Sequence, residues 1–69
     1  MKADVGDLIY IPSEVVLFKK DDSEKNVVEE WKKIKKPANL LITSLKKGAY
    51  EVYYESEYWL VDEKQVYKT

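Results

Sequence analysis

The side chains of this chain that could do chemistry are serines and carboxylates, and their spacing favours neither catalysis nor metal binding. Nucleophilic catalysis needs a hydroxyl or thiol beside a base, but the chain has no histidine and no cysteine. Glu55 and Glu57 could share a proton, although carboxylates beside a turn are more often solvated charges. The adjacent acids Asp21-Asp22 and Asp62-Glu63 lack the alternating oxygen spacing of a calcium loop. The sequence therefore predicts a protein that is not an enzyme and needs no cofactor or metal.

The aromatic residues are better candidates for a site, because a core this small cannot bury all nine of them. Tyrosine and tryptophan dominate the hot spots of protein interfaces. Strand alternation places the following residues inside: Ile9, Ile11, Val52, Val61 and Val66, lined by Tyr50, Tyr54 and Trp59. The predicted binding aromatics are Tyr10, Trp31, Tyr53 and Tyr58. The alternative is that an arm of the chain covers the outer tyrosines, with Trp31 or Phe18 as the lid.

Charge is divided sharply between two neighbouring segments. Residues 32–47 carry six lysines and no acid, whereas residues 48–63 carry five acids and no base. Opposite charges could face each other across paired strands, or the lysines could form a patch for phosphate groups. The net charge of −1 disfavours a dedicated nucleic-acid binder, and a surface of both signs suits protein docking. The predicted binding lysines are Lys33, Lys36, Lys46 and Lys47.

The length and composition indicate one small domain over residues 1–69. A chain of this size buries only about 60% of the surface that its unfolded form exposes. The absence of cysteine fits a reducing cytoplasm. No apolar run approaches the roughly 18 residues that would span a bilayer. We therefore expect a cytoplasmic protein that does not contact a membrane.

The elements that must position these side chains are mostly short strands. The expected strands span residues 7–12, 39–45, 50–55, 58–61 and 66–68, with the run at 14–18 extending the first. Gly48 is expected at the positive-φ position of one hairpin turn, and Ser56-Glu57 forms a second turn. Residues 62–65 are expected to form one turn of 3₁₀ helix.

The segment between residues 19 and 38 is ambiguous. Val27, Trp31 and Ile34 fall at helical spacing, and Asp22 or Ser23 could cap a helix. This pattern predicts a short helix at about 23–36, ended by Pro37. The competing interpretation is an irregular arm that folds back over the rest of the domain.

This order of elements resembles the SH3-like barrel. The resemblance rests on Gly6-Asp7 followed by Ile9 and Ile11, on the hairpin around Gly48, and on Trp59-x-Val61 followed by Val66. It covers nearly the whole chain, with residues 13–38 in the place of the family's first long loop. It implies a mainly β fold, a five-stranded barrel with a long first arm.

The chain departs from eukaryotic peptide-binding SH3 domains, because it lacks their Ala-Leu-Tyr-Asp-Tyr stretch and their paired tryptophans. Polyproline binding is therefore not expected. The short, lysine- and tyrosine-rich sequence is similar to small SH3-like accessory proteins of tailed bacteriophages. That similarity implies a host or viral protein as partner, and a location in the host cytoplasm.

The favoured hypothesis is thus a non-catalytic protein–protein interaction module. The alternative is a nucleic-acid-binding barrel resembling KOW or Tudor modules, in which lysines contact phosphate and an exposed tyrosine stacks on a base. A third possibility is a small homo-oligomer that uses an edge strand.

Overall fold

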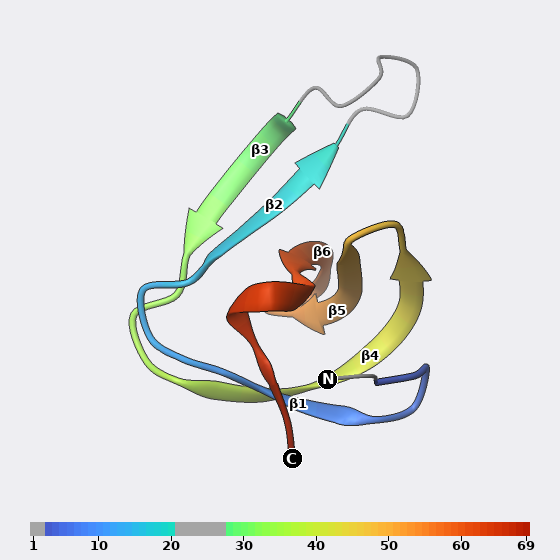
Figure 1. The fold of residues 1–69 in the computed structure, drawn as a ribbon. Helices are drawn as coiled ribbons and strands as arrows, with labels where there is room; N and C mark the ends of the chain where they lie inside the picture. The colour runs from blue at the N-terminus through green and yellow to red at the C-terminus, as the bar shows by residue number, and fades with distance from the viewer. Residues whose placement is uncertain (1–2, 21–27) are drawn as a thin grey trace.

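The described part of the chain forms one antiparallel sheet of seven strands that coils around a small hydrophobic core (Figure 1). The computed structural model describes residues 3–20 and 28–69. The elements are β1 (Leu8–Ile11), β2 (Val16–Lys20), β3 (Val28–Lys33), β4 (Ala38–Lys46), β5 (Ala49–Tyr54), β6 (Glu57–Asp62), the 3₁₀ helix η1 (Glu63–Gln65) and β7 (Tyr67–Lys68). The mainly β fold predicted from the sequence is confirmed.

The sheet is not a closed five-stranded barrel. Its strand order is β3-β2-β6-β5-β4-β1-β7, so β3 and β7 are the two edges. The two additional strands come from the arm, because β2 and β3 form a hairpin that projects from the coiled body of the sheet (Figure 1). Between the arm and β6 the register contains one pair, Phe18 with Leu60.

The prediction of a helix at about 23–36 is wrong for residues 28–36, the part that the structure describes. Residues 28–33 form β3, which pairs with β2 through Phe18–Trp31 and Leu17–Lys32. The first part of the expected helix, with both candidate caps, lies outside the described residues. Pairing with β2 satisfies backbone hydrogen-bonding groups of β3. This tertiary interaction outweighs the weak helical preference of the segment.

The run at 14–18 does not extend the first strand. Glu14 has a positive φ of 74°, and its amide donates to the carbonyl of Ile34. The chain turns at this residue and begins β2 as a separate strand at Val16. Because β2 and β3 then pair as antiparallel strands, with one register shift between Lys19 and Lys20, the described part of the arm is mainly β-strand rather than irregular chain.

The turns of the central strands follow local sequence signals. Gly48 has a φ of 77°, as expected for the β4–β5 turn. In the β5–β6 turn, Glu55 and Ser56 have φ values of 50° and 67°. Positive φ at both central residues matches the twist of the flanking strands. This turn lies one residue earlier than the Ser56-Glu57 turn predicted from the sequence.

The 3₁₀ turn predicted over residues 62–65 is confirmed as η1. Asp62 caps it, because its Oδ1 accepts a hydrogen bond of 2.9 Å from the amide of Lys64. This turn directs the chain from β6 into the short edge strand β7, which pairs with β1.

The core contains the aliphatic side chains that alternation placed inside, with Tyr50 and Trp59 buried among them and Tyr54 packed against them. Among the described residues, four further buried residues were not in the predicted interior: Leu17, Ile34, Ile42 and Ala49. Leu17 and Ile34 belong to the arm, so the arm covers part of the core. It does not do so with Trp31, which is exposed.

Candidate functional site

Five apolar side chains share the outer face of four neighbouring strands. The register sets Tyr53 beside Tyr58 on β5 and β6, and it sets Phe18 beside both Leu60 on β6 and Trp31 on β3. Residues directly opposite each other in an antiparallel sheet point to the same face. These five residues therefore form a continuous strip from β5 to β3, which we call the outer aromatic face.

The rings of the outer aromatic face are accessible to a partner. Trp31 is 64% exposed, Tyr58 56% and Tyr53 49%. The two tyrosine rings pack edge to face, with centroids 5.1 Å apart and an interplanar angle of 66°. This contact orders both rings without burying them. Contiguous exposed apolar surface of this kind is typical of interaction sites.

A groove of about 460 Å³ runs along this face. Phe18, Tyr58 and Leu60 line it together with charged side chains of both signs: Lys19, Lys20, Lys46, Lys47, Glu29 and Glu51. The Nζ atom of Lys20 lies 5.7 Å from the centroid of the Phe18 ring, a cation–π distance. The lining of the groove thus combines apolar with charged side chains, as small binding sites do.

The structure brings together five of the eight predicted binding residues. Trp31, Tyr53 and Tyr58 belong to the outer aromatic face, and Lys46 and Lys47 line its groove. Phe18 was considered only as a lid over the tyrosines, and Leu60 was not singled out. Strand alternation places Phe18 outside once β2 is known, but only the pairing of β2 with β6 joins it to the tyrosines.

The other three predicted residues are not part of this group, although Lys33 lies on β3 with Trp31. Tyr10 packs against Tyr67 on β7, with ring centroids 6.4 Å apart, at the opposite edge of the sheet. The Nζ atom of Lys33, at the end of β3, lies 3.9 Å from a carboxylate oxygen of Glu14. Lys36 is exposed in the bend between β3 and β4.

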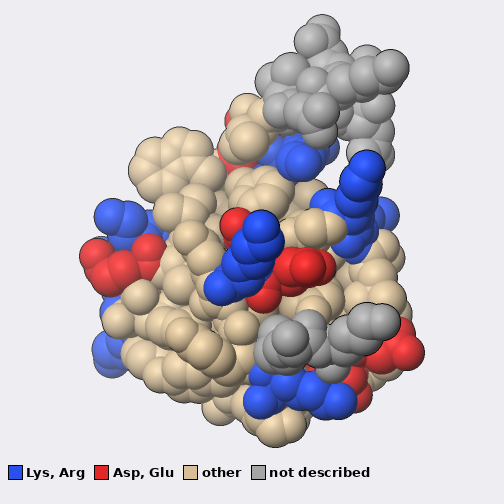
Figure 2. Space-filling model, viewed as in Figure 1, with Lys and Arg blue, Asp and Glu red and all other residues tan. Residues whose placement is uncertain are grey.

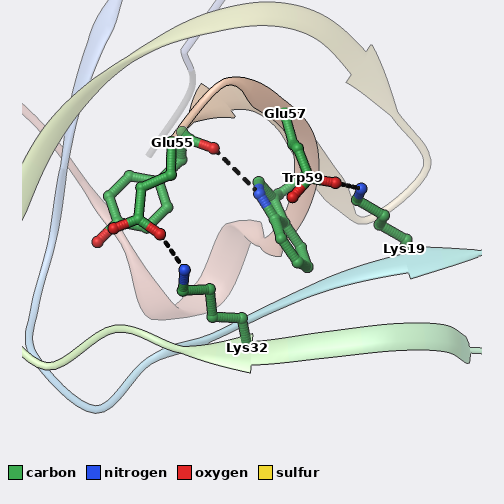
Figure 3. Close-up of polar contacts among 6 residues, drawn as sticks. Lys19, Lys32, Glu55, Glu57 and Trp59 are labelled. Atoms are coloured by element: carbon green, nitrogen blue, oxygen red, sulfur yellow. Dashed lines mark hydrogen bonds and ion pairs between the residues drawn. The ribbon is translucent and has the colours of Figure 1, made fainter.

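Two ion pairs tie the arm to the β5–β6 hairpin, as Figure 3 shows. Lys19 of β2 donates to Glu57, and Lys32 of β3 donates to Glu55. The Lys19 Nζ atom also lies 4.6 Å from the centroid of the Trp59 ring. The pair between Lys32 and Glu55 joins the basic and acidic segments of the sequence, but through the arm rather than across the β4–β5 hairpin.

Both lysines have a pKa raised above the ordinary value of 10.5, first because each donates a hydrogen bond to its glutamate and further through Coulomb attraction to nearby acids. A raised folded pKa means that the stabilisation is fully present below pH 10.5. It is lost as the pH rises through the folded pKa.

We therefore expect the stability that these lysines contribute to disappear in alkaline solution. The measurement compares urea unfolding of the wild type with the double variant Lys19→Met, Lys32→Met between pH 8 and pH 12. The difference between the two proteins should be constant below about pH 10 and shrink above it. Taking the difference between the two proteins cancels the contributions of the side chains that both share. A difference that stays constant to pH 12 would contradict the role of the two ion pairs.

Charges of both signs are interspersed on the face of the molecule seen in Figure 2, where lysines and acids lie in small neighbouring groups. That face carries no extended surface of a single sign. Among the described residues, no group of three or more histidine, cysteine or acidic side chains is placed to hold a metal ion. In the same part of the chain, no helix has the length and hydrophobicity to cross a membrane.

Comparison of the chain with protein-family models, with curated protein sequences and with solved structures returned no match. The outer aromatic face must therefore be interpreted from its own residues.

Proposed function

We propose that this chain is a non-catalytic protein-binding module and that its outer aromatic face contacts the partner. The observation that supports this most strongly is the apolar strip from β5 to β3. The exposed Tyr53–Tyr58 ring pair lies at one end and exposed Trp31 at the other, with half-buried Phe18 and Leu60 between them. Aromatic side chains bring a large contact area at a small cost in conformational entropy.

We also propose that the fold is of the SH3-like class. The order of elements supports this: a first strand, a hairpin arm, a three-stranded meander, a 3₁₀ turn and a short last strand. The arm takes the place of the family's first long loop, and β1 pairs with both β4 and β7. The resemblance to phage accessory proteins makes a bacterial host the natural source of partners.

The surroundings of the outer aromatic face favour a protein over other ligands. Interfaces typically combine an apolar centre with a polar rim, and the groove has this composition, with lysines and glutamates on its walls. The ordered tyrosine pair pre-organises part of the surface, which lowers the entropy lost on binding.

A second candidate function is supported by the lysines of the same groove. Lys20, Lys46 and Lys47 approach it beside Tyr58, and single-stranded nucleic acids bind through positive charge combined with aromatic stacking. The affinity of such a complex would fall steeply with added salt. Glu29 and Glu51 on the same walls oppose phosphate, so we rank this function second.

The test is capture from bacterial lysate with the immobilised chain, with and without nuclease. We expect one stoichiometric protein that survives nuclease and is lost when the bait carries both Tyr58→Ala and Trp31→Ala. The matched control is Tyr67→Ala, because Tyr67 is as exposed as these residues but lies on β7. Ligands that disappear with nuclease would favour the nucleic-acid function. A protein retained equally by all baits would contradict a site on the outer aromatic face.

Substitution of a single tyrosine should separate binding from folding. Because Tyr53 is about half exposed, Tyr53→Ala should lower the free energy of unfolding by less than about 1.5 kcal/mol, the value of an aromatic pair. Affinity for the captured partner should fall about tenfold or more, as at an interface hot spot. Urea denaturation and titration calorimetry measure the two effects. An unfolded variant would show that Tyr53 is a core residue.

A further inference from the structure

The strand β3 leaves one backbone edge open. It is six residues long, it is the first strand in the sheet order, and among the described residues only β2 pairs with it. Its side chains are exposed apart from the half-buried Lys32. Just beyond the strand, the amide of Ile34 donates to the carbonyl of Val15, and its carbonyl accepts from the amide of Glu14. Both backbone groups of Ile34 therefore face the β2 side. Backbone direction alternates along a strand, so the amide and carbonyl groups of Trp31 and Lys33 are directed toward the open edge.

The residues of this open edge are self-complementary in charge. Two acids, Glu29 and Glu30, precede Trp31, and two lysines follow it. A second copy of the strand, running antiparallel and centred on Trp31, would set each acid opposite a lysine. From this arrangement we infer that the chain forms a symmetric dimer in which the β3 edges of two copies pair, Trp31 opposite Trp31. An isologous two-fold interface requires such a self-complementary patch.

The pairs in this register are specific. Glu30 lies opposite Lys32 of the second copy on the inner face. Glu29 is the extra residue at the register shift of the β2–β3 pair. Its side chain lines the groove on the outer face, so it comes beside Lys33 of the second copy on that face. Lys32 already donates to Glu55 of its own chain, but an ammonium group has three donors and can bond both carboxylates. Opposite charges directly across a ladder stabilise it, and like charges destabilise it.

Neighbouring registers are disfavoured by the same residues. A shift that pairs odd with even positions would place an outward side chain opposite an inward one, which a continuous sheet does not allow. Centring the pair on Glu30 sets two carboxylates opposite each other, and centring it on Lys32 does the same for two ammonium groups. The register centred on Trp31 avoids both conflicts. Charges on edge strands commonly block such pairing, but here their order selects one partner, a second copy.

The dimer joins the two outer aromatic faces into one surface, because Trp31 is the last ring of each face at the shared edge. A partner with two sites, or two partners, would then meet both copies together, with the gain in avidity that this brings. The inference does not rest on the proposed function, since the purified chain without any partner tests it.

The first experiment is sedimentation equilibrium of the full chain from about 10 µM to about 1 mM. The mass should rise from 8.1 kDa toward twice that value. Glu29→Lys and Lys33→Glu, each alone, set like charges opposite each other twice per dimer and should weaken association about tenfold or more. The matched control Glu63→Lys changes the net charge as Glu29→Lys does, but lies on η1 and should leave association unchanged.

Mixing the two edge variants provides the decisive measurement. In a dimer of Glu29→Lys with Lys33→Glu, both outer pairs become lysine opposite glutamate, so the mixture should regain the association that each variant lost. Circular dichroism of each variant checks that it is folded. A wild type that remains at 8.1 kDa at about 1 mM would overturn the inference. A wild-type dimer whose edge variants behave like Glu63→Lys, or a mixture without recovery, would overturn it as well.

Discussion

Replacing Trp59 by alanine is expected to unfold most of the protein at 25 °C. Trp59 is 3% exposed, its Nε1 donates a hydrogen bond of 3.2 Å to the carbonyl of Tyr54, and Lys19 lies over its ring. Removing a buried tryptophan costs about 3–5 kcal/mol. A single core in a chain of this length rarely supplies more than about 3–5 kcal/mol in total. The loss therefore equals most of the stability of the domain.

The second tryptophan is the matched control. Trp31 is 64% exposed, so Trp31→Ala should change the free energy of unfolding by no more than about 0.5 kcal/mol. Urea denaturation of both variants, followed by circular dichroism at about 5 µM, compares the same substitution at a buried and at an exposed position. The low concentration is chosen to limit any self-association. A folded, cooperative Trp59→Ala variant would show that the core near the β5–β6 turn repacks around the lost ring.

The central strands could be predicted from the sequence because their signals are local. In β1, Ile9 and Ile11 alternate with Leu8 and Tyr10, and the structure buries the first pair and exposes the second. Gly48 and the polar residues around Asp62 mark turns where the structure has them. Alternation along β5 and β6 also placed Tyr53 and Tyr58 outside, so part of the candidate site was visible in the sequence.

The arm could not be predicted because its conformation depends on distant residues. Trp31 and Ile34 fit one face of a helix as well as they fit a strand, since the spacing of a few apolar residues does not separate the two. Pairing with β2 decides in favour of the strand. It turns Trp31 outward, whereas Ile34, just past the strand end, enters the core.

The extent of the site depended on the same distant contacts. Phe18 joins the tyrosines through its register with Leu60, 42 positions later in the chain. Lys33 and Tyr10 were grouped with the site by residue type, but Lys33, at the end of β3, lies near Glu14. Tyr10 pairs with Tyr67 on β7, at the edge opposite β3. Composition indicated which residue types to expect in a site, and tertiary pairing determined which of them meet.

The attachment of the arm should depend strongly on Leu17. Among the described residues, Phe18 with Leu60 is the one register pair between the arm and β6. The two ion pairs to the β5–β6 hairpin are solvent-exposed, so apolar burial contributes much of the attachment. Leu17 is fully buried, and Ile34 enters the core beside it. Leu17→Ala should therefore lower the free energy of unfolding by roughly 3 kcal/mol, within the range for buried leucines.

The strands that lose hydrogen-exchange protection in Leu17→Ala show whether the arm is an integral part of the fold. Leu45→Ala is the matched control, because Leu45 is 46% exposed and its truncation should cost less than about 1 kcal/mol. Urea denaturation measures both variants, and hydrogen exchange locates the effect. If the arm belongs to the cooperative core, Leu17→Ala lowers the protection of β4, β5 and β6 together with that of β2. Loss of protection confined to β2 and β3 would mean that the hairpin opens on its own, which would leave the remaining strands to hold the core.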